Sequence, residues 1–414
     1  MNDLPAGFGG EPAKQTPYGR WERYGVEEID ELAEAVRQQT LFYASGRKVK
    51  QLESDFAAKL GARHAIATSS GTASIHAALI AAGISPGDEV IVSPITDMGT
   101  VAPILFQGAV PVFADLDPSG HVLDPGDVAR RITRRTKAVL AVHLWGNACD
   151  LDALGALCDE HGIHLIEDCA QAFGATWRGR PVGTIAPMGC FSLNEFKHIS
   201  CGDGGIVVTD DDDLAVRLRL ATDKGYDRRP DALIRQPTFL CNNYRMTELQ
   251  GAVAVAQLRK LDAIVARRRE FAEGLRKRLT ESPGLLLPTP TPGADPSWWF
   301  FFLRIDPVRL GVDAKQFAAL LGKDGIRASP NYIGVPIYRY PIFADHSAFP
   351  RGGHAYERQC YRAGDCPEAE AILDTGVQIP VSEGFTETDL EEVAHGVDRL
   401  CRWLSTHDRY ASIA

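Results

Sequence analysis

The stretch "HAIATSSGTASIHAALIAAG" (residues 64–83) joins a strand pattern to an apolar helix pattern through a short turn of serine, glycine and threonine. The same alternation continues to about residue 210. Short β-rich runs such as "DEVIVS", "PVFADL", "AVLAVHLWG" and "IHLIEDC" are separated by helix patterns such as "TVAPILFQGA" and "DLDALGALCDEHG". This alternation predicts an α/β fold built from parallel βαβ units, in which ligands bind at the carboxyl ends of the strands.

The pattern changes after the stretch "YRMTELQGAVAVAQLRKLDAIVARRREFAEGLRKRL" (residues 244–279), which predicts one or two long helices. Residues 281–297 are rich in proline and glycine and are typical of a linker or loop. A smaller α+β region should follow, from the strand "WWFFFLRID" to the helix "ETDLEEVAHGVDRLCRWL". We therefore expect an N-terminal arm and large domain over residues 1–255, and linking helices with a small domain over residues 256–414.

Composition excludes several classes of protein. The chain of 414 residues is 45% hydrophobic and 24% charged, which is ordinary for a globular protein, and its net charge of −10 argues against nucleic acid as a partner. No apolar run is long enough for a membrane span, and "MNDLPAGFGG" does not resemble a signal peptide. Nine cysteines without paired CxxC spacing predict reduced thiols, with no disulfide framework or metal site. We expect a cytoplasmic protein that binds neither membrane nor metal.

A phosphate site is predicted where the first strand meets its helix. The residues at this junction are Ser69, Ser70, Gly71 and Thr72. The first backbone N–H groups of a helix have no partner within it, and together with the helix dipole they attract an anion. The alternative is a plain Ser/Thr helix cap.

Acidic residues close a later apolar strand in "LIEDCAQAFGA" (residues 165–175). A buried Asp168 at the end of this strand needs a cationic or protonated partner, and Gln171 follows three residues later. Alternatively, Glu167 and Asp168 are polar residues at the point where the chain leaves the strand.

One lysine lies between a strand pattern and three glycines in "FSLNEFKHISCGDGG" (residues 191–205). Taken alone, Lys197 is most simply a solvated surface charge. The order along the chain favours another interpretation, because a phosphate cradle is followed by the acid Asp168 and then by Ser192 and Lys197. Pyridoxal 5'-phosphate (PLP) requires a phosphate anchor, an acid that keeps its ring nitrogen protonated and a lysine that forms a Schiff base. Lys197 would form that bond and then carry the proton that is moved during the reaction.

The chain resembles the DegT/DnrJ/EryC1/StrS aminotransferases along nearly its whole length. The blocks that carry the resemblance are "SSGTASIHAAL", "GDEVIVSPIT", "GAVPVFADLD", "AVHLWGNACDLDAL", "IEDCAQAFGA", "FSLNEFKHISCGDGG", "NYRMTELQGAVAVAQL" and "CPEAEAIL". The resemblance implies the fold-type I architecture of PLP-dependent transferases, like that of aspartate aminotransferase, with a large mostly parallel sheet and a smaller C-terminal α+β domain. It also implies transamination of a nucleotide-linked keto-sugar or a keto-cyclitol, with glutamate or glutamine as the amino donor.

The resemblance also implies a role for individual residues. Lys197 matches the Schiff-base lysine, Asp168 the acid at the pyridine nitrogen and Gln171 a ring-contacting glutamine. Ser192 matches the phosphate-binding serine, and Gly71 with Thr72 the phosphate-binding pair, next to Ser70. A residue of the "NYR" block reaches the cofactor phosphate of the neighbouring subunit in this family. Asn243 is our choice for it, with Arg245 second, so a homodimer with composite sites is implied.

Two segments depart from the family pattern. Where an aromatic residue usually stacks on the cofactor ring, this chain has Asp97 followed by Met98. Either Met98 covers the ring or Asp97 contacts a hydroxyl or amine of the substrate; alternatively, Asp97 caps the following helix. Residues 331–365 form a long run rich in Tyr, Arg and His, which would border the substrate entrance or form a packed loop.

Two other functions remain open at the level of sequence. Some relatives with this fold dehydrate sugars, and in those a histidine replaces the lysine, so Lys197 favours transamination. A catalytically silent binding or regulatory protein would fit the missing aromatic residue. The joint presence of Asp168, Gln171, Ser192 and Lys197 argues against it.

Overall fold

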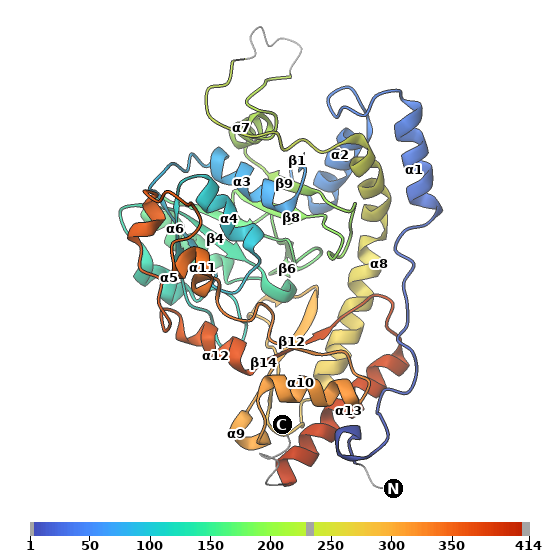
Figure 1. The fold of residues 1–414 in the computed structure, drawn as a ribbon. Coiled ribbons are helices and arrows are strands. Elements are labelled where there is room, and N and C mark those ends of the chain that lie inside the picture. Colours follow the sequence, from blue (N-terminus) through green and yellow to red (C-terminus); the bar gives the residue numbers. More distant parts are fainter. Residues whose placement is uncertain (1–3, 229–235, 408–414) are drawn as a thin grey trace.

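The computed structural model describes residues 4–228 and 236–407, which are arranged around one large sheet and a smaller one (Figure 1). The large sheet has seven strands in the order β1-β9-β8-β5-β4-β2-β3. In chain order these strands are β1 (His64–Thr68), β2 (Glu89–Val92), β3 (Val110–Phe113), β4 (Thr136–Val142), β5 (His164–Asp168), β8 (Met188–Ser192) and β9 (Gly205–Thr209). Strand β9 is antiparallel to both neighbours, and all other pairs of neighbouring strands are parallel.

The strands of this sheet are buried along nearly their whole length, as expected for parallel strands covered on both faces. The helices associated with the sheet are α2 (Lys48–Leu60), α3 (Gly71–Ala81), α4 (Met98–Phe106), α5 (Pro125–Arg131), α6 (Leu151–His161) and α7 (Asp212–Thr222). Helix α3 packs against β8 and β9 and also against α4 and α7. Its sequence is apolar all round, and residues 73–81 are all buried, so its first turn is fixed in the body of the molecule.

A single helix, α8 (Glu248–Arg278), forms where one or two long helices are predicted, and Figure 1 shows it running along the molecule from α1 and α2 toward the C-terminal elements. It begins with a capping box in which Thr247 and Gln250 satisfy each other's backbone groups. It packs against α1 (Val26–Arg37), α2 and α13 (Glu387–Thr406). The boundary proposed between residues 255 and 256 falls inside this helix, so α8 belongs to both regions.

The C-terminal region contains a four-stranded antiparallel sheet in the order β10-β12-β14-β13. Its strands are β10 (Leu285–Leu286), β12 (Phe300–Ile305), β13 (Ser329–Pro330) and β14 (Gly376–Pro380). The other helices of this region are α9 (Pro307–Leu310), α10 (Ala314–Lys323), α11 (Pro341–Ala344) and α12 (Pro367–Thr375). A further three-stranded sheet joins the two regions, because β11 (Ala294–Asp295) pairs with β6 (Thr176–Trp177), which pairs with β7 (Arg180–Pro181).

The N-terminal segment packs on the C-terminal region before the chain reaches α1. The backbone N–H of Ala6 donates to Asp324, which follows α10, at 2.9 Å. The ammonium of Lys14 lies 2.9 Å from Asp389 and 2.6 Å from Glu392, both on α13. The segment from Ala6 to Lys14 is therefore held by elements of the predicted small domain, beside which Figure 1 places it.

Residues 331–365 are mostly a packed loop, and they lie against β3, the last strand of the large sheet. The phenol of Tyr361 donates to the carbonyl of Pro111 at 2.9 Å. The Phe113 ring packs edge-on against Phe343 and Tyr361. Short helical turns η3 (Ile337–Arg339) and η4 (Ala355–Arg358) give this segment its shape. Of this segment, Tyr332 contacts Gln171 at 3.2 Å, and none of its residues lines the cavity described below.

The helices of residues 4–228 and 236–407 include none that is both long enough and apolar enough to cross a membrane.

Candidate active site

Most of the predicted site residues line one cavity of about 340 Å³ at the carboxyl ends of β1, β2, β5 and β8. The lining residues are Ser70, Gly71, Thr72, Ile75, Asp97, Gly99, Thr100, Asp168, Ala170, Ser192, Asn194, Phe196, Lys197 and Asp203. They come from segments far apart in the sequence, and the strand order of the sheet brings these segments together. A cavity in this position agrees with the expectation for a largely parallel sheet.

The first turn of α3 forms one wall of the cavity. Ser70 is the N-cap of this helix, and its hydroxyl accepts from the N–H of Ala73 at 3.1 Å. Gly71 and Thr72 follow as the first two helical residues, whose N–H groups have no acceptor within a helix. A Cβ atom on Gly71 would lie 2.6 Å from the Cβ of Ser192, so only glycine lets α3 approach the end of β8 so closely. The helix cap and the phosphate cradle are thus compatible features of the same turn.

Asp168 is buried at the end of β5 and is held by two donors. The hydroxyl of Thr100 donates to one carboxylate oxygen at 2.8 Å, and the N–H of Ala170 donates to the other at 3.0 Å. Burial raises the pKa of Asp168, although both hydrogen bonds and the charge of Lys197 oppose this shift. Each oxygen keeps a lone pair, so the carboxylate can still accept from a protonated ring nitrogen.

Lys197 is buried, with 9% of its surface exposed, so it is not an ordinary surface charge. Its ammonium makes no hydrogen bond or ion pair in the part of the chain that the structure describes. Instead, Nζ lies 4.1 Å from the centroid of the Trp299 ring. Burial lowers the pKa of Lys197, and the nearby carboxylates of Asp168 and Asp97 oppose this shift. A lysine with a lowered pKa is more readily available as a neutral nucleophile.

Asp97 caps α4, as one of the alternatives predicts, and it also lines the cavity. One carboxylate oxygen accepts from the N–H of Gly99 at 2.7 Å. The other has no hydrogen-bond partner among residues 4–228 and 236–407, and the side chain is exposed. Met98 is partly buried against the hydrophobic core and does not line the cavity. Asp97 is thus free to bind a ligand through its second oxygen.

Gln171 is buried beside the cavity and is not part of its lining. Its side-chain carbonyl accepts from the N–H of Trp145 at 2.9 Å, and its amide donates to the phenol of Tyr332 at 3.2 Å. These bonds fix the orientation of the amide. The proposed contact of Gln171 with a cofactor ring stays a prediction.

Asn243 is exposed, lies outside the cavity of its own chain and pairs with Asp223 in an isolated β-bridge. The next residue is tied to the predicted phosphate site, because the carbonyl of Tyr244 accepts from the N–H of Ser69 at 2.8 Å. The guanidinium of Arg245 is held by Asp223 at 2.5 Å. Since Arg245 is already paired, Asn243 remains our choice for a residue that reaches a neighbouring subunit.

Glu167 points away from the cavity and has a structural role. Its carboxylate accepts from the N–H groups of Gly183, Ile185 and Ala186 at 2.7–2.9 Å and contacts Nε2 of His143 at 3.0 Å. It lies close to His143 and Cys169, a set that contains metal-ligand types. Both oxygens of Glu167 are already occupied, so this set is explained by hydrogen bonding within the protein.

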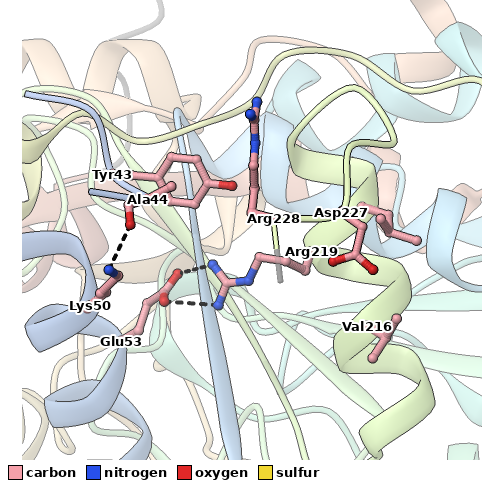
Figure 2. A pocket seen from close by; sticks show the side chains of 9 residues that line it. Tyr43, Ala44, Lys50, Glu53, Val216, Arg219, Asp227 and Arg228 are labelled. Atoms are coloured by element: carbon pink, nitrogen blue, oxygen red, sulfur yellow. Dashed lines mark hydrogen bonds and ion pairs between the residues drawn. The ribbon is translucent and has the colours of Figure 1, made fainter. Parts of the chain in front are cut away.

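A second cavity of about 420 Å³ lies between α2 and α7 (Figure 2). It is lined by Tyr43, Ala44, Lys50, Glu53, Val216, Arg219, Leu220, Asp227 and Arg228. Figure 2 shows the Arg219 guanidinium bound by both oxygens of Glu53, at 2.6 and 2.9 Å, and Lys50 donating to the carbonyl of Ala44. Its lining includes no residue that the sequence predicts for the site, so the first cavity is the candidate active site.

Three residues that contact predicted site residues are missing from the sequence-based prediction. Thr100 orients Asp168, Trp299 contacts Lys197, and Tyr332 contacts Gln171. Thr100 could have been predicted from the sequence, because it is a hydroxyl residue in the first turn of the helix that follows strand β2. Tyr332 belongs to the aromatic run already singled out, whereas Trp299 lies in a segment whose pattern indicates only a buried strand.

The chain is similar to known proteins over most of its length, including the residues of the site. Residues 23–398 match the family model described as the DegT/DnrJ/EryC1/StrS aminotransferase family. SpsC, a spore coat polysaccharide biosynthesis protein of Bacillus subtilis (strain 168), is 33% identical over 385 residues, or 90% of this chain and 94% of SpsC.

Two solved structures are also similar to this chain over nearly its whole length. DesV of S. venezuelae, solved in complex with a ketimine intermediate, is 30% identical with a TM-score of 0.82, over 95% of this chain and 100% of DesV. DesI, solved in the presence of its TDP-sugar product, is 29% identical with a TM-score of 0.81, over 97% of this chain and 96% of DesI. The residues that match the family model, 23–398, include every residue predicted for the site.

Proposed function

Because the chain belongs to the DegT/DnrJ/EryC1/StrS family of PLP-dependent aminotransferases, we propose that it aminates the keto group of a nucleotide-linked sugar, with glutamate or glutamine as donor. The observation that carries the proposal is a buried lysine and a buried aspartate in one cavity with the open first turn of a helix. The TDP-sugar product of DesI and the polysaccharide pathway of SpsC support a sugar substrate. Amino-sugar synthesis for a secondary metabolite or a surface glycan is the corresponding role, and a free keto-cyclitol is the alternative acceptor.

The residues of the cavity fit PLP. Gly71 lets the first turn of α3 pack closely on Ser192, and this turn lines the cavity together with the hydroxyl residues Ser70, Thr72 and Ser192, as a phosphate site requires. Asp168 would hold the ring nitrogen, and Lys197 would form the covalent bond. When bound, PLP supplies an electron sink for the carbanion formed as the amino group is transferred.

The chain's own residues supply the proton transfers. Thr100 and Ala170 fix the direction of the Asp168 carboxylate, so it can keep a proton on the facing nitrogen. The lowered pKa of Lys197 suits a group that must accept a proton at one carbon and deliver it at another.

Asp97 gives the first testable prediction, because it combines a helix cap with a free oxygen. We propose that this oxygen binds a hydroxyl or the incoming amino group of the substrate. Asp97→Asn keeps a capping acceptor and loses the charge, so it should raise the acceptor's KM or lower kcat about tenfold. Cofactor content should stay nearly unchanged. Steady-state kinetics with varied acceptor, together with the cofactor absorbance, measure both.

The matched variant Asp97→Ala also removes the cap. It should show the same kinetic defect and lose about 1 kcal/mol of stability besides. Wild-type kinetics in Asp97→Asn, combined with the stability loss in Asp97→Ala, would mean that Asp97 serves α4 alone.

A homodimer with composite active sites is part of the proposal. The exposed position of Asn243 outside its own cavity supports it. Large apolar side chains are also exposed: Val26 is 63% exposed, Ile29 65% and Leu240 93%. A second copy of the chain would cover such residues.

Mixing two impaired variants tests the composite site. Lys197→Ala and Asn243→Ala homodimers should each be impaired, the latter through weaker cofactor binding. A hybrid dimer carries both defects in one site and none in the other, so co-refolding the two variants should recover about a quarter of the wild-type sites. Absence of any recovery, with hybrids verified by mass, would show that Asn243 does not act across subunits.

The amino donor and acceptor can be identified in two steps. Adding glutamate or glutamine should bleach the colour of the loaded protein, and a panel of nucleotide-linked keto-sugars and keto-cyclitols should restore it. Mass measurement of the aminated product names the acceptor. A coloured protein that no amino donor bleaches would favour the silent binding protein, and a dehydrated product would favour the dehydratase.

We also propose a cytoplasmic location. All nine cysteines are free thiols, and Cys149, Cys158, Cys169, Cys190, Cys366 and Cys401 are buried. This pattern is typical of a reducing compartment.

A further inference from the structure

Trp299 is the group that the ammonium of Lys197 faces. Nζ of Lys197 lies 4.1 Å from the centroid of the indole ring, within the range of a cation–π contact. The indole N–H donates to the carbonyl of Phe196, the residue before Lys197, at 2.8 Å. The same tryptophan therefore contacts both the side chain of the lysine and the backbone that carries it.

The ring itself is held in place by the C-terminal region. Trp299 directly precedes β12, and its backbone N–H donates to the backbone carbonyl of Trp145 at 2.9 Å. Its ring meets the Tyr332 ring edge-on, with centroids 6.0 Å apart. Tyr332 in turn accepts from Gln171 beside the cavity. Two predicted cofactor residues that follow strands of the large sheet, Lys197 and Gln171, thus contact two aromatic side chains from the C-terminal region.

We propose that Trp299 is a positioning residue for Lys197, whose indole face holds the lysine Nζ at the cavity and favours its charged form. This inference rests on the proposed role of Lys197. An aromatic face stabilises a cation without accepting its proton, unlike a carboxylate. Lys197 is thereby oriented without an ion pair that it would have to break each time it forms or releases a covalent bond.

The electrostatic surroundings of Lys197 come from several elements. Asp168 at the end of β5 and Asp97 at the start of α4 favour its charged form. Arg23 of the N-terminal segment donates to the Lys197 carbonyl at 2.8 Å, and the neighbouring His198 is buried with its pKa well below the usual value. Burial raises the pKa of Tyr332, so its phenol stays neutral. These groups are unchanged when the indole is removed. Loss of the indole face, which favours the charged ammonium, should therefore lower the pKa of Lys197.

The test measures the pKa of Lys197 in the cofactor-free full-length chain. Competitive acetylation with acetic anhydride across a pH series, read by mass spectrometry of the Lys197 peptide, gives that value directly. Trp299→Leu should lower it by about one unit, and Trp299→Phe, which keeps a weaker aromatic face, by less. Trp177→Leu is the matched control, since its ring also faces a cation, but that cation is Arg178, at 5.4 Å, and not Lys197.

The sign of the shift decides the proposal. An unchanged or raised pKa in Trp299→Leu would overturn it, because the ring would then act only by keeping water out. If Trp299→Leu does not fold, Trp299→Met, which has similar reach and no aromatic face, takes its place under the same criterion. The measurement uses neither cofactor nor substrate. Failure of the proposed sugar transamination would therefore appear separately, in the bleaching and product assays.

Discussion

Lys197→Ala should abolish turnover while leaving the fold intact. The amino group is the only one in the cavity lining that can form a Schiff base, so no neighbour can replace it. Removing it leaves no protein group without a hydrogen-bond partner, because the Lys197 ammonium makes no hydrogen bond or ion pair among the described residues. The variant should therefore melt at or above the wild-type temperature. Activity assays and a thermal melt of the cofactor-free protein measure the two effects.

Lys197→Arg separates the positive charge from the covalent chemistry. Arginine keeps the charge but stays protonated, so it should be as inactive as alanine. In the wild type, borohydride should fix the cofactor to the peptide that contains Lys197. Covalent label on another lysine, such as Lys224, would contradict the assignment.

Asp168→Asn should cost several orders of magnitude in turnover, since a neutral amide no longer keeps the ring nitrogen protonated. The substitution should be accommodated. The amide oxygen can accept from Ala170, and the amide nitrogen can donate to the Thr100 hydroxyl, which can donate to Thr96, 2.8 Å away. Single-turnover kinetics with saturating cofactor measure the loss. Near-normal rates would assign the nitrogen contact to another group.

The same variant carries a stability signature with a defined sign. Burial raises the pKa of Asp168 above its value of 3.8 in the unfolded chain, so the folded state loses stability as the pH rises through the raised pKa. Asn cannot ionise, so cofactor-free Asp168→Asn should gain thermal stability over the wild type at pH 8, and this gain should shrink toward pH 4. Asp212→Asn, which alters a surface carboxylate paired with Arg63, is the control. A gain that does not change with pH would argue against burial as its cause.

Much of the fold could be predicted because its signals are local. Alternation of strand and helix patterns over residues 64–210 predicts the mostly parallel sheet, and both the fold class and the family resemblance are confirmed. The reversed direction of β9 was not predicted, since the direction of a strand depends on how the chain returns to the sheet. The sequence does not decide between one helix and two over residues 244–279, because the basic residues of this stretch contain no clear signal for a helix end. The structure shows the single helix α8.

The site residues that could be predicted are those that lie at or just after the ends of strands. Asp168, Ser192 and Lys197 follow or end neighbouring strands, so a sequence pattern can find them. Trp299 and Tyr332 come from the C-terminal region, and only the tertiary fold brings them into contact with Lys197 and Gln171. Asp97 shows a different limit, because one carboxylate can cap a helix and face a ligand at once, which makes the two predictions compatible.

The packing of residues 331–365 on β3 has a consequence for solubility and for engineering. Strand β3 is the last of the large sheet, and the groups of Pro111 and Phe113 that do not pair with β2 point outward. Tyr361 donates to the Pro111 carbonyl and Cys366 to that of Phe113, while Pro111 has no N–H to offer. This edge is thus closed to strands from other molecules. Shortening the segment in an engineered variant would uncover an apolar edge strand, and aggregation should then limit such variants.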